Sequence, residues 1–98
     1  MEIKKVKNEN KLELTLIGRL DTTTAPQLEA ELKESLDGVS DLKLDFAELE
    51  YISSAGLRVL LAAQKTMNKQ GSMTIKNAGA DIMEVFEITG FTDILTIV

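Results

Sequence analysis

Two adjacent serines stand where the sequence changes from a strand pattern to a helix pattern. They are Ser53 and Ser54 in the stretch YISSAGLRVLLA, residues 51–62, and an apolar helical run follows them. A serine in this position can cap the helix, because its oxygen accepts a hydrogen bond from a free N–H group of the first turn. It can also accept a phosphoryl group or act as a nucleophile. These three kinds of chemistry need different neighbours, so the rest of the sequence bears on the choice.

The composition argues against a catalytic serine. The 98 residues contain no His and no Cys, which excludes Ser-His-Asp and Cys-His arrangements. No Lys lies within a few residues of Ser54, and ISSAG lacks the G-x-S-x-G pattern of a nucleophile elbow. The commonest metal ligand is also missing. We therefore expect no enzyme activity, no metal and no cofactor.

The charge and hydropathy of the chain limit its partners and its location. Its net charge is −5, it has four aromatic residues, and it lacks a basic run, which argues against binding to nucleic acid or to an anionic membrane surface. The start, MEIKKVKNEN, has no apolar core of a signal peptide, and no apolar run approaches the roughly 20 residues of a transmembrane helix. We predict a cytoplasmic protein that is a monomer when free, with residues 1–98 forming one domain.

The first residues predict a β-hairpin. Residues 2–7 (EIKKVK) and 11–17 (KLELTLI) have strand patterns, and the second alternates apolar and polar side chains. Asn and Glu at positions 8–10 suit a tight turn, so we expect the two strands to be antiparallel. Gly18 is expected to end the second strand.

A helix is expected to begin near Thr24. Thr24 and Gln27 form a capping-box pattern, and Pro26 falls in the first turn, where its missing N–H group does no harm. Its buried stripe follows helical spacing and consists of Leu28, Leu32 and Leu36.

The remaining sequence alternates strands and helices. Strands are predicted at 42–46, 72–76 and 94–98, and helices at about 55–70 and 80–89. Such alternation predicts a single-domain α/β fold with a mixed, mostly parallel sheet after the N-terminal antiparallel hairpin, and with helices packed against the sheet.

Polar residues follow two of the predicted strands. Asp21 and Thr22 come after the second strand. Asp45 is at the end of the central strand, and Ser53 and Gly56 follow that strand. Ligand sites in open α/β sheets tend to lie where strands end and helices begin. If these two strands are neighbours, both loops open at the same edge of the sheet.

Each of these residues also has a structural interpretation. Asp21 could position a partner or simply belong to a turn, and Asp45 could bind N–H groups of the loop. Thr22 is expected to be a turn residue, like the two threonines after it. Gly56 would allow close approach of another segment, and Arg58 is expected to project into solvent, where it could pair with an acidic residue of a partner.

Three segments together resemble a known family. GRLDTTTAPQLEAEL, LKLDFAELEYISSAGLRVLL and the helix end EITGF occur in the order and spacing of the STAS domain. The chain is most similar to the bacterial anti-sigma factor antagonists, and the resemblance covers nearly all of it. It implies a STAS fold.

The resemblance also implies a mechanism. In the family, the serine two residues before the glycine, here Ser54, is phosphorylated by the anti-sigma factor, which is a serine kinase. The positions of Asp21 and Asp45 lie beside it. The resemblance implies that the unphosphorylated protein binds the kinase, that phosphorylation breaks the complex, and that a serine phosphatase restores it.

The chain departs from the family beside the acceptor. Many phosphorylated members have Asp immediately before the acceptor serine, and here Ser53 occupies that position. Ser53 is therefore an alternative acceptor. An alternative function also remains: an unphosphorylated STAS module that serves as an accessory or scaffold subunit of a transport or signalling assembly.

Overall fold

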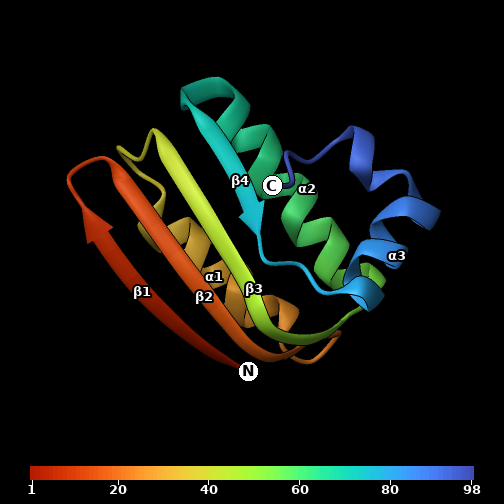
Figure 1. The fold of residues 1–98 in the computed structure, drawn as a ribbon. Helices are drawn as coiled ribbons and strands as arrows, with labels where there is room; N and C mark the ends of the chain where they lie inside the picture. Colours follow the sequence, from red (N-terminus) through yellow and green to blue (C-terminus); the bar gives the residue numbers. More distant parts are fainter.

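Four strands, three α-helices and one short 3-10 helix make up the chain (Figure 1). The structure is a computed structural model that describes residues 1–98. The elements are β1 (Glu2–Asn8), β2 (Lys11–Leu20), α1 (Ala25–Ser35), β3 (Asp41–Ile52), α2 (Ser54–Gln70), β4 (Ser72–Lys76), α3 (Ala80–Thr89) and the 3-10 helix η1 (Phe91–Asp93).

The strands form one mixed sheet in the order β1-β2-β3-β4. β1 pairs antiparallel with β2, and β2 with β3 and β3 with β4 pair parallel. The predicted α/β class, the hairpin and the mostly parallel sheet are therefore confirmed. Because β2 and β3 are parallel neighbours, the loops that follow them leave the same edge of the sheet.

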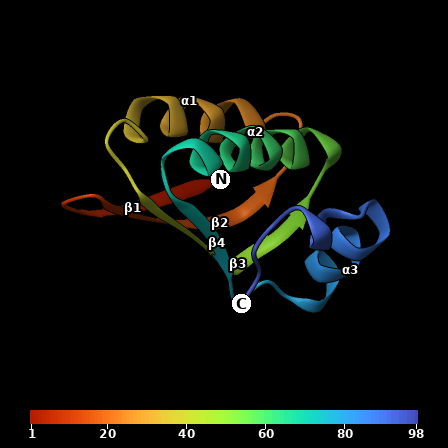
Figure 2. The ribbon, with the colours of Figure 1, turned by 90° about the horizontal axis from the view of Figure 1, so that it is seen from above.

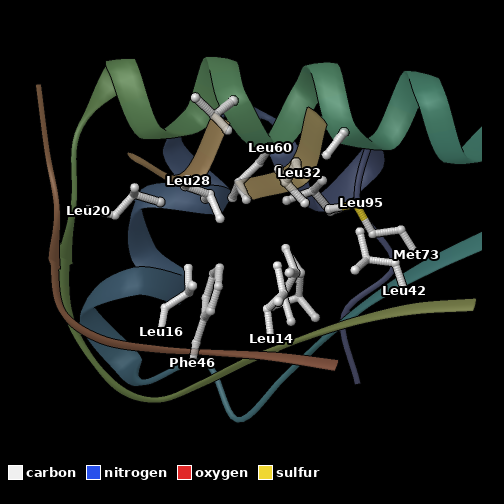
Figure 3. Packing of buried hydrophobic residues seen from close by; sticks show 14 of the residues in the cluster. Leu14, Leu16, Leu20, Leu28, Leu32, Leu42, Phe46, Leu60, Met73 and Leu95 are labelled. Atoms are coloured by element: carbon white, nitrogen blue, oxygen red, sulfur yellow. The ribbon is translucent and has the colours of Figure 1, made fainter. Parts of the chain in front are cut away.

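The core lies between the sheet and the two helices α1 and α2, which cover one of its faces (Figure 2). Alternate residues of the strands point into it, and the predicted stripe of α1 is buried opposite them. α3 packs beside β3 and adds Phe86, whose ring centroid lies 6.4 Å from that of Phe46. Figure 3 shows how side chains from the sheet and the helices meet in this layer, among them Leu14, Leu16, Leu20, Leu28, Leu32, Phe46 and Leu60.

The second strand runs past the glycine that was expected to end it. Gly18 has φ = +106°, a value that residues with a side chain rarely adopt, and the pairing of β2 with β3 shifts register on both sides of Ile17 and Gly18. Such bulges allow a strand to bend and then continue. The prediction was wrong because a glycine in a strand can mark a bulge as well as an end.

The central strand is also longer than predicted. It was expected over 42–46, but β3 continues to Ile52. From Phe46 onward, burial recurs at every third residue instead of every second, so the sequence loses the alternation typical of a strand. β4 pairs only with Asp41 to Asp45, and the second half of β3 contacts α3 on that side.

The predicted strand at 94–98 is wrong. Only a single bridge, between Ile75 and Ile97, joins this segment to β4. The amide of Ile75 donates to the carbonyl of Thr96 (2.9 Å), and the amide of Val98 donates to the carbonyl of Ile75 (3.0 Å). Of the apolar residues that suggested a strand, Leu95 is buried, whereas Ile94 and Val98 are exposed.

No helix of the structure has both the length and the apolar character that a membrane crossing requires.

Candidate functional site

Ser53, and not Ser54, caps α2. Ser53 has extended backbone angles (φ −100°, ψ 174°), and its hydroxyl oxygen accepts a hydrogen bond from the amide of Gly56. At 3.4 Å this bond is longer than is usual for an N–H to oxygen contact. The capping alternative considered for the serine pair therefore applies to Ser53.

Ser54 is the first residue of α2, and its side chain is exposed. Its hydroxyl makes no hydrogen bond with another protein group, whereas the hydroxyl of Ser53 is engaged in the cap. Because Ser54 is at the helix end, its side chain lies beside backbone N–H groups that have no partner within the helix. This hydroxyl is therefore free to meet a second molecule.

Gly56 fixes the start of α2 on the sheet. A Cβ atom at this position would lie 2.7 Å from Leu20 Cγ and 2.9 Å from Ile52 Cγ1, too close for any side chain. The amide of Ser53 donates to the carbonyl of Leu20 at 2.9 Å, which joins the helix start to the end of β2. The close approach expected at Gly56 is therefore made by Leu20 and Ile52 of the same chain.

Asp21 organises the turn between β2 and α1. Its Oδ1 accepts hydrogen bonds from the amides of Thr23 (3.0 Å) and Thr24 (3.1 Å), and its Oδ2 lies 3.7 Å from Nε of Arg19. The hydrogen bond from the Thr24 amide, helped by the other donors and by Arg19, lowers the pKa of the carboxyl against a smaller opposing effect of desolvation. Asp21 directly follows Leu20, so it lies at the same edge of the sheet as Ser53.

Thr24 does not form the predicted capping box with Gln27. Its backbone angles are helical (φ −96°, ψ −18°), and its side chain makes no capping bond to α1. The hydroxyl instead accepts from the amide of Asp21 (2.9 Å) and donates to the carbonyl of Arg19 (2.7 Å). Pro26 lies in the first turn of α1, as predicted.

Asp45 lies apart from Ser54. The expectation that it ends the central strand is wrong, because β3 continues for seven residues beyond it. Asp45 pairs with Thr15, whereas Ile52 pairs with Leu20, and five residues of β2 span roughly 17 Å at about 3.3 Å each.

The carboxylate of Asp45 has a structural role. Its Oδ1 accepts from the amide of Ala47 and from Nδ2 of Asn77, each at 3.0 Å. The hydrogen bond from Ala47 is the largest cause of its lowered pKa, followed among the favourable contacts by Asn77 and Lys76, while desolvation opposes them. Asn77 has φ = +61°, so this contact ties the strained turn after β4 to β3.

Thr22 and Arg58 line a small groove between the starts of α1 and α2. Its volume is about 220 Å³, and both side chains are exposed. The other lining residues are Ala25, Pro26, Glu29, Ala55 and Val59. A larger groove of about 310 Å³ lies further along the same two helices, but none of the predicted site residues lines it.

One pair at this edge was not found from the sequence. The guanidinium carbon of Arg19 lies 4.2 Å from the centre of the Tyr51 ring, on neighbouring strands, in a cation–π contact. Tyr51 is 41% exposed although it is a large aromatic residue. No signal in the sequence indicated this pair, because the strands were expected to end at 17 and 46 and both residues fell in the predicted loops. Without the register of β2 against β3, nothing placed them face to face.

Comparisons with known proteins agree with the fold and show the family. The family model described as "Mlab, STAS domain" matches residues 3–97. The anti-sigma-B factor antagonist of Bacillus subtilis is 32% identical over 91 residues, which cover 92% of this chain and 84% of the relative. A relative from Bordetella bronchiseptica, BtrV, is 42% identical over 84 residues, with 84% of this chain and 72% of the relative covered.

Solved structures show the same fold. An anti-sigma factor antagonist from Mycobacterium paratuberculosis superposes with a TM-score of 0.86 at 20% identity, covering 98% of this chain and 83% of that one. The anti-sigma factor antagonist SpoIIAA in its unphosphorylated form gives 0.77 at 16% identity, with 99% and 87% covered. A phosphorylated form of SpoIIAA, from Bacillus, gives the same TM-score at 17% identity, with 99% and 91% covered. The chain belongs to the STAS domain family, among the anti-sigma factor antagonists.

Proposed function

We propose that this protein is a partner-switching regulator. Without phosphate it binds an anti-sigma factor that is also a serine kinase, and so releases a sigma factor. Phosphorylation of Ser54 breaks the complex, and a serine phosphatase restores the binding form. The relatives are named as regulatory proteins and not as enzymes, which supports the general role.

The observation that carries the proposal is that the hydroxyls of the two serines differ in their hydrogen bonding. Ser53 is engaged in the cap, and Ser54 presents an exposed hydroxyl with no partner in the chain. In the transfer, the Ser54 oxygen attacks the γ-phosphorus of a nucleoside triphosphate bound to the kinase. The bond to the β-phosphate oxygen breaks, the diphosphate leaves, and the hydroxyl proton passes to a base of the kinase.

The fold accommodates a phosphate on Ser54. The group brings a charge of about −1.5 to −2, and it would lie at the positive end of α2, where anions are stabilised. The exposed position means that no core residue has to move. The charge instead changes the surface that meets the partner, and a coupling of about 1–3 kcal/mol is enough to change an affinity by five- to 150-fold.

The test is phosphopeptide mass spectrometry on the protein from its native cells, in growing and in stressed cultures. We expect phosphate on Ser54 with an occupancy that differs between the two conditions. Ser54→Ala should abolish it, and the matched variant Ser53→Ala should retain it. Phosphate on Ser53 alone would contradict the assignment, and no phosphate in any condition would favour the accessory or scaffold module.

A binding assay completes the test. Ser54→Ala is expected to co-purify with a kinase-type anti-sigma factor from stressed and unstressed cells alike, whereas Ser54→Asp should lose most of that binding. If the two variants retained the same partner to the same extent, the charge at position 54 would not be the switch.

A further inference from the structure

The two arginines of the chain are in different situations. Arg19 is engaged twice, by the carboxylate of Asp21 at 3.7 Å and by the ring of Tyr51. Arg58 is exposed and has no carboxylate oxygen within 4.0 Å, although it lines the groove between the starts of α1 and α2. A guanidinium group binds carboxylate or phosphate with several N–H donors at once. The guanidinium group of Arg58 is therefore available to bind a carboxylate or a phosphate.

The position of Arg58 relative to Ser54 follows from helix geometry. Ser54 is the first residue of α2, and Arg58 comes four residues later in the same helix. Residues four apart lie one turn apart on the same face, with Cβ atoms about 6 Å from each other. Both side chains are exposed, so the face they share is open. A phosphate on Ser54 and the long side chain of Arg58 can meet without any movement of the backbone.

The other charged groups at this edge do not compete strongly for Arg58. The Asp21 carboxylate is held by two backbone amides and lies near Arg19. Glu29 lines the same groove as Arg58, but its nearest cation is Lys33, at 3.9 Å on its own helix. A phosphate carries more charge than either carboxylate and presents three acceptor oxygens. It is the better ligand for a free guanidinium.

We propose that phosphorylated Ser54 forms an intramolecular ion pair with Arg58. Phosphorylation then removes a free cation from the exposed face of α2 that the two residues share, and at the same time it adds an anion to that face. This proposal rests on the proposed function. In the unphosphorylated protein, Arg58 is available to an acidic group of the partner. In the phosphorylated protein, the same guanidinium binds the phosphate on Ser54 of its own helix. Phosphorylation thus removes the favourable contact between Arg58 and an acidic group of the partner, and it places a phosphate that repels this acidic group.

The test places phosphoserine directly at position 54 by genetic encoding, so it does not depend on any kinase. The second pKa of the phosphate is then followed by phosphorus NMR in the otherwise unchanged chain, in Arg58→Gln and in the matched control Lys65→Gln. Lys65 is an exposed cation of the same helix, three turns from Ser54 at about 3.6 residues per turn. The effect of the helix end is the same in all three proteins and cancels in the comparison.

We expect the phosphate pKa in the unchanged chain and in Lys65→Gln to lie about half a unit below that in Arg58→Gln, because a nearby cation favours the dianion. The Nε–H resonance of Arg58 should move over the same pH range. Equal phosphate pKa values in Arg58→Gln and the unchanged chain, or an Arg58 resonance that does not respond, would overturn the proposal. Circular dichroism verifies that Arg58→Gln is folded. Absence of phosphate on Ser54 in cells would instead contradict the proposed function and leave this result intact.

Discussion

The two helices that cover the sheet begin in opposite ways, although the strands before them end at the same edge. Before α1, the carboxylate of Asp21 accepts from two amides, and the hydroxyl of Thr24 bridges the chain between Arg19 and Asp21. Before α2, the hydroxyl of Ser53 makes one long hydrogen bond and the hydroxyl of Ser54 makes none. The side-chain oxygens of Asp21 and Thr24 before α1 are thus engaged in their own turn, whereas the hydroxyl of Ser54 at the start of α2 is free.

This difference shows that a hydroxyl is made available by its neighbours and not by its residue type. Thr24 and Ser54 both stand at a helix start after a parallel strand, but only Ser54 lacks a partner in the chain. Gly56 contributes to the contrast, because it brings the start of α2 against Leu20 and holds Ser54 at the surface. Each of the following substitutions alters either the turn before α1 or the start of α2.

The largest effect on stability is expected for Gly56→Ala. The new methyl group would meet Leu20 and Ile52 below 3.0 Å, and forcing such a group into a packed contact costs about 1–3 kcal/mol. Chemical denaturation measures the loss. The matched variant is Gly79→Ala, where an added Cβ meets nothing within 4 Å. Similar midpoints for the two variants would mean that the start of α2 can move away from the sheet.

Asp21→Ala is expected to lower the denaturation midpoint less than Gly56→Ala but more than any change at the serines, because two backbone amides lose their acceptor. The lowered pKa of Asp21 adds a pH dependence. Its contribution is fully present above the unfolded value, near 3.8, and is lost as the pH falls through the lower folded pKa.

Acid denaturation of Asp21→Ala should therefore have a smaller slope below pH 4 than that of the wild type. Part of the slope remains, since Glu31 and Asp45 also have lowered pKa values. An unchanged slope would show that the turn before α1 does not depend on the charge of Asp21.

Ser53→Ala is expected to cost about 0.5–1 kcal/mol, at the low end for loss of a helix cap, because the capping bond is long. Urea denaturation of Ser53→Ala and Ser53→Asp gives the value, and the aspartate variant should recover the stability as an alternative cap. A loss as large as that of Gly56→Ala would mean that this cap is stronger than its geometry indicates.

Ser54→Ala should have the smallest effect, within about 0.5 kcal/mol of the wild type, as is usual for an exposed residue without partners. The same denaturation series provides the measurement. A cost above that of Ser53→Ala would reverse the assignment of the two serines and make Ser54 the structural one.

Much of the architecture could be predicted because its signals are local. The hairpin, the helix over 80–89 and the strand over 72–76 follow from alternation, spacing and turn residues. The helix and this strand have the predicted bounds, whereas the second strand of the hairpin runs three residues further. The errors arose where pairing decides the structure. In the sequence, Gly18 indicates the end of a strand, and only the pairing of β2 with β3 shows that it is a bulge. The apolar residues from 94 onward have a strand pattern, although only one bridge forms.

The candidate site was predictable in place but not in detail. The serine pair marks the start of α2, but a shift of one residue in that start decides which serine caps, and sequence patterns do not locate helix ends that closely. The pairing of Arg19 with Tyr51 depends on the register between two strands. The distance of Asp45 from Ser54 depends on how far β3 extends, which its irregular burial pattern concealed.

The irregular pairing of β2 with β3 sets a limit on insertions and deletions. From the pair Thr15–Asp45 to the pair Leu20–Ile52, β3 uses two residues more than β2, and the register shifts absorb the surplus before either strand ends. Both strands therefore finish level, which puts the turn of Asp21 beside Ser53. Losing or gaining one residue between Phe46 and Leu49 would break the three-residue spacing that buries Phe46, Leu49 and Ile52. The spacing of this short segment is thus as constrained as the identity of the serine that it positions.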